Sequence, residues 1–227
     1  PERERDDPQP LKYGTFGTGT GTSNIPVTGV GFQPTVVLFW GNRSAGGDQA
    51  APLTAGFGWG STSTSRACWY GGVRDGSEIR KNWLLTDTCF GLYDSTIAST
   101  DGRLDLVSLD SDGFTVIPDD AFTADFTVHY LALGGDLTSV ASGSGTWGTT
   151  NGSYAVTGLS FQPELVLVLY ANYDRGAVGL ESTGDVGPQF AVAKSSSVRM
   201  CCGNAANGAA TQRLVDQELL AQHGIVK

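Results

Sequence analysis

The stretch VTGVGFQPTVVLFW, from Val27 to Trp40, decides the architecture because it returns as VTGLSFQPELVLVL, from Val156 to Leu169. Eight of the fourteen positions are identical at a constant offset, and most of the others exchange one apolar residue for another. The identical positions in the first copy are Val27, Thr28, Gly29, Phe32, Gln33, Pro34, Val37 and Leu38. A long repeat within one chain indicates a duplicated structural unit. We therefore expect two copies of one module.

The composition favours strands over helices. The 227 residues include 32 glycines, only 16% are charged and 10% are aromatic. A chain of this length can form two domains that each bury a core. Frequent glycine, threonine, valine and aromatic residues are typical of short strands joined by tight turns. The predicted fold class is therefore all-β.

A hairpin follows the repeated stretch in both copies. AGFGWGS (55–61) and RACWY (66–70) predict its two strands, and FAVAKSSSVRMCC (190–202) is the later counterpart. This alignment places Arg66 with Arg199 and Cys68 with Cys201. Alternating glycines in the first strand predict that another backbone approaches it closely.

The predicted domains are an extended N-terminal arm (1–13), a first module (14–137) and a second module (138–227). The arm is rich in charge and proline, which leaves two interpretations open: a disordered tail, or a segment that orders against a neighbouring subunit. Near the other end, residues 212–222 suggest a short helical turn.

The second copy is expected to be incomplete. Aligning Asp101–Leu104 with His223–Val226 leaves no counterpart of SDGFTV (111–116) or FTVHYLALGG (126–135). Either the polypeptide has been shortened, or copy one or a neighbouring chain supplies the missing strands. An incomplete sandwich would expose an apolar face and open strand edges.

Charge and hydropathy argue against two classes of partner. The formal net charge is −9 and the basic residues are scattered, so we expect no nucleic-acid binding. No apolar run approaches the roughly 20 residues that span a bilayer, and the N-terminus does not resemble a signal peptide. We therefore expect a soluble chain with no membrane partner.

The sequence predicts no catalytic, cofactor or metal residues. His129 and His223 are the two histidines that could act as a catalytic base, but the sequence contains no GxSxG nucleophile motif. We therefore expect no enzyme. LDSDG (109–113) begins like a calcium loop but lacks the later glutamate, so a hairpin turn is favoured.

The four cysteines are interpreted mainly as structural. They contain no C-x-x-C pair, which argues against a zinc site. Free buried thiols are favoured, and one disulfide, Cys68–Cys89 or a pair that includes Cys202, remains the alternative.

Three motifs carry a resemblance to known proteins: GFQPTVVLFW (31–40), DSDGFTV (110–116) and VHYLALGG (128–135). In these the sequence is similar to β-rich repeat modules of tailed-bacteriophage virion proteins. The resemblance implies β-sandwiches of jelly-roll or lectin-like type, in this chain two in tandem with the second incomplete. It also implies a non-enzymatic protein on a virion head, tail or fibre, whose partners are its own copies and other virion proteins. No functional residues carry over from such modules.

A carbohydrate-binding adhesin or receptor-binding module is the alternative function. Exposed aromatic rings in loops would stack on a glycan, and Trp69, Tyr70 and Tyr173 are the candidates. Arg66 and Arg199, paired by the repeat, are further candidate ligand or interface residues. For all five residues, packing within the fold or a local ion pair is the competing interpretation.

Overall fold

The computed structural model describes residues 11–44, 53–73, 80–135, 139–141, 155–171, 188–193, 199–206 and 215–221. Every regular element in these residues is a β-strand, which confirms the predicted all-β class. The strands are β1 (Leu11–Gly17), β2 (Ile25–Thr28), β3 (Pro34–Ser44), β4 (Leu53–Gly60), β5 (Arg66–Val73), β6 (Arg80–Leu85), β7 (Phe90–Tyr93), β8 (Thr100–Asp110), β9 (Gly113–Asp120), β10 (Thr127–Gly134), β11 (Val166–Ala171), β12 (Pro188–Ala193), β13 (Arg199–Ala206) and β14 (Val215–Ala221).

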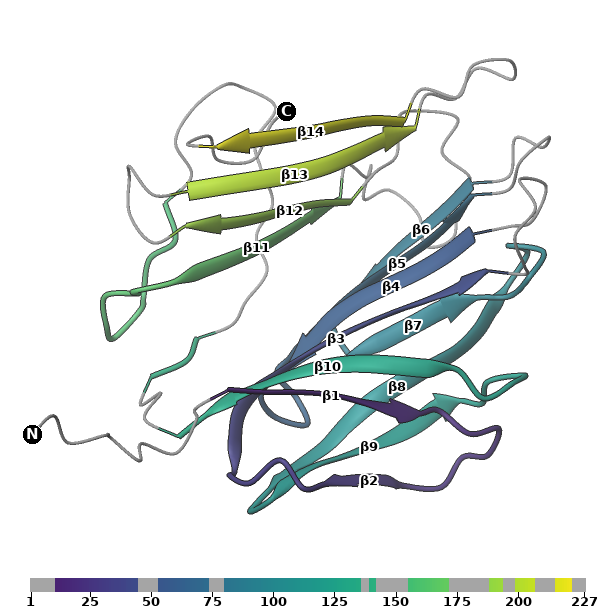
Figure 1. The fold of residues 1–227 in the computed structure, drawn as a ribbon, viewed down its shortest axis with the longest axis horizontal. Coiled ribbons are helices and arrows are strands. Elements are labelled where there is room, and N and C mark those ends of the chain that lie inside the picture. Colours follow the sequence, from purple (N-terminus) through teal and green to yellow (C-terminus); the bar gives the residue numbers. More distant parts are fainter. Residues whose placement is uncertain are drawn as a thin grey trace, which may run out of the picture.

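Two antiparallel sheets form the first copy (Figure 1). The larger has the order β1-β10-β3-β4-β5-β6 and the smaller β2-β9-β8-β7. Along β4 and β10 every second residue is buried, as expected when one face of a sheet meets a core. Fully buried phenylalanines from both sheets meet in that core: Phe39 of β3 packs edge to face on Phe114 of β9, with 5.5 Å between ring centroids. The two sheets therefore share one apolar interior.

Glycines on the inner face of β4 set how closely the sheets approach. A Cβ atom added at Gly56 would overlap the carbonyl oxygen of Gly91, and one added at Gly58 would overlap that of Cys89. Both carbonyls belong to the segment that enters and forms β7. The predicted close approach of another backbone is confirmed, and glycine is required because any side chain would push β7 away.

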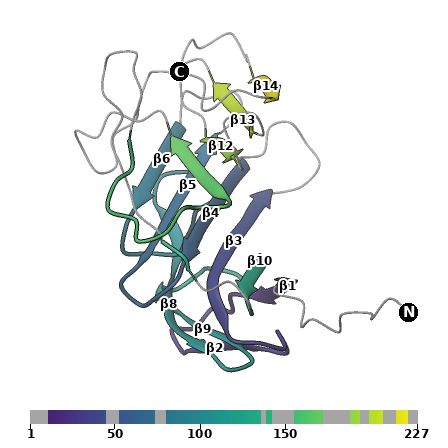
Figure 2. The same cartoon turned by 90° about the vertical axis from the view of Figure 1, so that its left-hand side faces the viewer.

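The third sheet, of order β11-β12-β13-β14, reproduces the pairing of β3 to β6. Phe57 of β4 lies opposite Trp69 of β5, and at the equivalent position Phe190 of β12 lies opposite Cys202 of β13. The pairing of β11 with β12 follows that of β3 with β4 in the same way. Figures 1 and 2 place this sheet beyond β4 to β6, on the side turned away from β8 and β9. The duplication is therefore structural as well as sequential.

Two expectations about boundaries are wrong. Residues 215–221 form strand β14 instead of a helical turn. Leu219 pairs with Cys202 as Leu84 pairs with Trp69, so β14 corresponds to β6. Residues 223–226, which the sequence aligned with 101–104, lie outside the described residues. The first strand begins at Leu11, so residues 11–13 belong to the large sheet and not to the arm.

Candidate binding face

The outer face of the large sheet, the side away from β7, β8 and β9, carries large apolar or aromatic side chains on all six strands. One row across the strands contains His129, Trp40, Phe57, Trp69 and Leu84, which are opposite one another in the ladder. The next row contains Tyr13, Leu131, Leu38, Trp59 and Ala67. Opposite residues of paired strands project to the same side, so these side chains form one continuous surface. We call this surface the outer face.

Four large apolar side chains at the rim of the outer face are exposed. Tyr13 is 53% exposed on β1, at one edge of the sheet, and Leu84 is 48% exposed on β6, at the other. Leu11 and Leu53 belong to the same group. The outer face is thus open to solvent at both edges of the sheet, while its centre is half-buried or buried.

Three rings near β1 form a stacked group that also carries polar atoms. Tyr13, His129 and Trp40 have centroids 5.9–6.0 Å apart, and their planes differ by 12° to 30°. The Tyr13 hydroxyl and Nδ1 of His129 share a hydrogen bond of 2.7 Å. His129 of strand β10 thus packs between two aromatic rings of the neighbouring strands. Such a group offers apolar ring surface beside polar atoms, a combination enriched at recognition sites.

Trp69 and Tyr70 are not exposed loop residues. Both lie in β5; Trp69 is 7% exposed on the outer face and Tyr70 is fully buried in the interior. The Tyr70 hydroxyl is hydrogen-bonded to Thr100 Oγ1 at 2.9 Å, and burial raises the pKa of this phenol. The indole N–H of Trp69 has no hydrogen-bond partner among the described residues. The expectation that these two rings present flat surfaces to a sugar is therefore wrong.

Arg66 is held within the fold. Its guanidinium donates to Asp105 Oδ2 at 2.9 Å and to the carbonyl oxygen of Leu106 at 3.2 Å, and also contacts the carbonyl oxygens of Ser63 and Asp87. Burial raises the pKa of Asp105, against the opposing effect of Arg66. Arg66 thus joins the β4–β5 turn to β8 of the opposite sheet. The side chain of Arg199 and the whole of Tyr173 lie outside the described residues.

Asp112 clamps the loop at the start of the repeated stretch. Gly29 N–H and Gly31 N–H donate to its carboxylate oxygens at 3.1 Å and 2.6 Å, and both glycines have positive φ, 80° and 88°. This explains the aspartates of LDSDG as turn and loop acceptors. Within the part of the chain that the structure describes, no group of three or more His, Cys, Asp or Glu could hold a metal ion.

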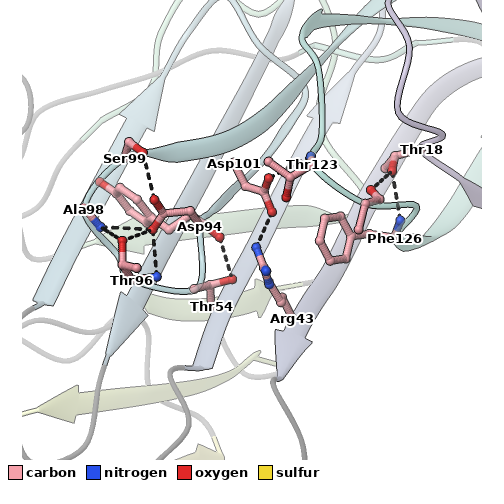
Figure 3. A network of polar contacts seen from close by, with 12 residues as sticks. Thr18, Arg43, Thr54, Asp94, Thr96, Ala98, Ser99, Asp101, Thr123 and Phe126 are labelled. Atoms are coloured by element: carbon pink, nitrogen blue, oxygen red, sulfur yellow. Dashed lines mark hydrogen bonds and ion pairs between the residues drawn. The ribbon is translucent and has the colours of Figure 1, made fainter.

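Two more carboxylates tie loops to the sheets (Figure 3). Asp101, whose side chain is fully buried, pairs with Arg43 and accepts the Thr123 N–H at 2.9 Å; the Arg43 guanidinium lies 5.2 Å from the Phe126 ring. Asp94 accepts hydrogen bonds from three later residues of its own turn, Thr96, Ala98 and Ser99. Sequence reasoning missed these residues, because a lone Arg or Asp beside a loop carries no recognisable pattern.

The repeated motif itself lines a shallow depression of about 560 Å³. Its lining residues are Phe32, Gln33, Pro34, Thr35, Ser61, Leu109 and Gly135. The amide of Gln33 donates to the carbonyl oxygen of Leu109 at 2.9 Å, so this side chain joins two loops of the fold. The outer face, which combines exposed area with an aromatic group, is the better candidate for binding.

Cys68 and Cys89 are free and fully buried. Burial raises the pKa of both thiols, which confirms the interpretation of these two as structural residues. The side chains of Cys201 and Cys202 lie outside the described residues.

Comparison with known proteins finds no matching family model, no matching curated protein and no matching solved structure. A search of the described residues for helices finds none that is long and apolar enough to span a membrane.

Proposed function

We propose that this protein is a non-enzymatic structural component of a virion surface that decorates or stabilises a head or tail through contacts between its copies. The observation that carries the proposal is the outer face, where large apolar side chains remain exposed at both edges of a six-stranded sheet. Large apolar side chains left exposed on one face of a sheet are a feature of association sites. The resemblance of three sequence motifs to phage virion modules supports the location.

The duplication supports assembly further. The third sheet repeats β3 to β6 with the same pairing, and the positions opposite one another on its equivalent face are Leu169, Phe190, Cys202 and Leu219. One chain therefore carries two sheets with similar apolar faces. Linked binding surfaces strengthen association through effective concentration, which suits a protein that binds a repetitive lattice.

Analytical ultracentrifugation and negative-stain microscopy of the purified chain test the proposal. We expect symmetric oligomers, and we expect Leu84→Lys and Tyr13→Lys to weaken their association at least tenfold by charging the outer face. Val107→Lys is the matched control, because Val107 is 38% exposed on β8 of the other sheet. A monomer at all concentrations, or equal effects of all three substitutions, would contradict the proposal. Antibody labelling of virions from the source would then test the location.

We propose glycan binding as the second candidate function, favoured by the stacked group of Tyr13, Trp40 and His129. Aromatic faces pack against the apolar faces of sugars, and the Tyr13–His129 hydrogen bond places polar atoms beside them. The stacked group at the β1 edge thus replaces Trp69 and Tyr70 as the candidate glycan site.

A glycan array separates the two candidates. Reproducible binding that Tyr13→Ala removes and Val107→Ala preserves would favour the adhesin. Tyr13 suits this test because it is exposed, whereas truncation of the buried Trp69 would disturb the fold. An array without reproducible binding, together with oligomers that depend on Leu84, would leave assembly as the function.

A further inference from the structure

We infer that strand β11 is an assembly edge that pairs antiparallel with β11 of a second copy of this chain. The inference rests on the proposed assembly function and deepens it by naming the strand and its partner. It joins two four-stranded sheets into one continuous sheet across a two-fold axis. Such an isologous contact needs one self-complementary strand and no further component.

The first copy shows what this edge binds. Strand β3, the equivalent of β11, is bonded on one side to β4 and on the other to β10. Strand β11 is bonded on one side to β12, and no described strand pairs with its other side. The β10 strand of the same chain cannot fill this place, because β1 and β3 already occupy both of its edges. By equivalence with β3, the open side of β11 fits an antiparallel strand, which we assign to a second copy of the chain.

Among the six edge strands of the described sheets, β11 alone lacks a feature that protects edges from pairing. Charged residues, proline and short length are such features. Lys12 lies in β1, Arg80 and Lys81 in β6, Asp216 and Glu218 in β14, and Pro26 in β2, while β7 has 4 residues. Residues 165–171 read LVLVLYA, with no charge, proline or glycine. This composition is typical of strands that associate.

The exposure of this segment agrees with an unfilled edge. Leu165, Val166 and Leu167 are 55%, 41% and 38% exposed. Successive side chains of a strand point to opposite faces, so exposure of consecutive residues indicates that neither face is fully covered here. A partner strand would extend both faces beside these side chains and remove apolar area from water.

The inner face of the third sheet cannot accept a strand as β4 accepts β7, which directs association to the edge. Ladder equivalence places Gln189 where Gly56 stands and Ala191 where Gly58 stands. In the first copy, a Cβ at Gly56 overlaps the carbonyl oxygen of Gly91 in β7, and one at Gly58 overlaps that of Cys89 just before β7. Backbone pairing at the edge of β11 does not require glycine, because its hydrogen bonds are independent of side-chain size.

Cysteine scanning tests the inference directly. Single cysteines are placed at 166, 167, 168, 169 and 170 in a Cys201→Ser, Cys202→Ser background, and the chains are oxidised. Across a two-fold axis, only residues close to the axis face their own copies, so we expect disulfide dimers from one or two neighbouring positions and none from Val107→Cys on β8. Equal cross-linking at all sites, or none within the scan, would overturn the inference.

Ultracentrifugation distinguishes this edge from the outer face. We expect Val168→Pro, which removes a backbone N–H, and Leu167→Lys, which charges the edge, to weaken the dimer at least tenfold. Circular dichroism and thermal melting check that both variants fold. If Leu84→Lys disrupts oligomers while Val168→Pro and Leu167→Lys do not, the edge assignment fails and the proposed assembly function stands. A wild-type chain that stays monomeric would contradict both the edge assignment and the proposed assembly function.

Discussion

Gly58 shows how a single absent side chain sets the distance between two sheets. We predict that Gly58→Ala destabilises the first copy by about 1–3 kcal/mol, because the new methyl group must push away the carbonyl oxygen of Cys89. Ala191→Gly, at the equivalent position of the third sheet, is the matched control, and its expected cost is at most about 1 kcal/mol. Urea unfolding measures both, and equal effects would show that the close contact is unimportant.

The two buried thiols of the first copy should be unreactive in the native state. Burial raises the pKa of Cys68 and Cys89, so the reactive thiolate is scarce at neutral pH and reagents cannot reach it. In a Cys201→Ser, Cys202→Ser background, we expect no rapid reaction with a thiol reagent at pH 8 and two reactive thiols after denaturation. Rapid labelling of the folded chain would contradict the burial of these residues.

Asp94 gives the stability of the first copy a pH dependence. Partial burial acts to raise its pKa, but hydrogen bonds from Thr96, Ser99 and Ala98 outweigh this and lower the pKa. A carboxyl whose pKa is lower in the folded chain stabilises the fold above its unfolded pKa of about 3.9 and loses that contribution as the pH falls through its folded value. We expect the stability difference between wild type and Asp94→Asn to shrink below about pH 4. A constant difference between pH 7 and pH 2 would rule this out.

At the scale of elements, Arg66 links the β4–β5 turn to β8. We predict that Arg66→Met costs about 3 kcal/mol, since it leaves the half-buried Asp105 without its cation. Arg199→Met is the matched control from the second copy, where no described strand corresponds to β8, and its expected cost is smaller. Denaturant unfolding compares the two variants; equal losses would mean that Arg66 acts mainly within its own hairpin.

Local patterns predicted several elements well. The β4–β5 hairpin followed from alternating glycine and aromatic residues, and β10 followed from the alternation of VHYLALG. Strand β14 was missed because its sequence, VDQELLA, consists largely of residues that also favour a helix. Pairing with β13 overrides this preference, and such non-local effects are absent from a window of sequence.

For the whole molecule, the repeat predicted the duplication but not the layout of the sheets. The chain order does not reveal that β1 pairs with β10, whose partners Tyr13 and Leu131 are far apart in sequence. The sequence likewise did not reveal the candidate binding face. Trp69 is recognisable as an aromatic residue from sequence, but only the ladder register shows that it shares a face with Trp40 and Phe57.

The glycines on the inner face of β3 and β4 also bear on how the two copies can change. At the four inner positions of β3 and β4 that are glycine, Gly41, Gly56, Gly58 and Gly60, the second copy has Tyr170, Gln189, Ala191 and Ala193. Returning one of them to glycine would weaken its strand by roughly 0.5–1 kcal/mol. Another sheet could pack on this face only after several of these residues had been replaced by glycine. Each of the first replacements therefore lowers stability without adding a compensating contact. Single substitutions towards glycine in the second copy therefore cost stability before a facing sheet can compensate, which opposes conversion of one copy into the structure of the other.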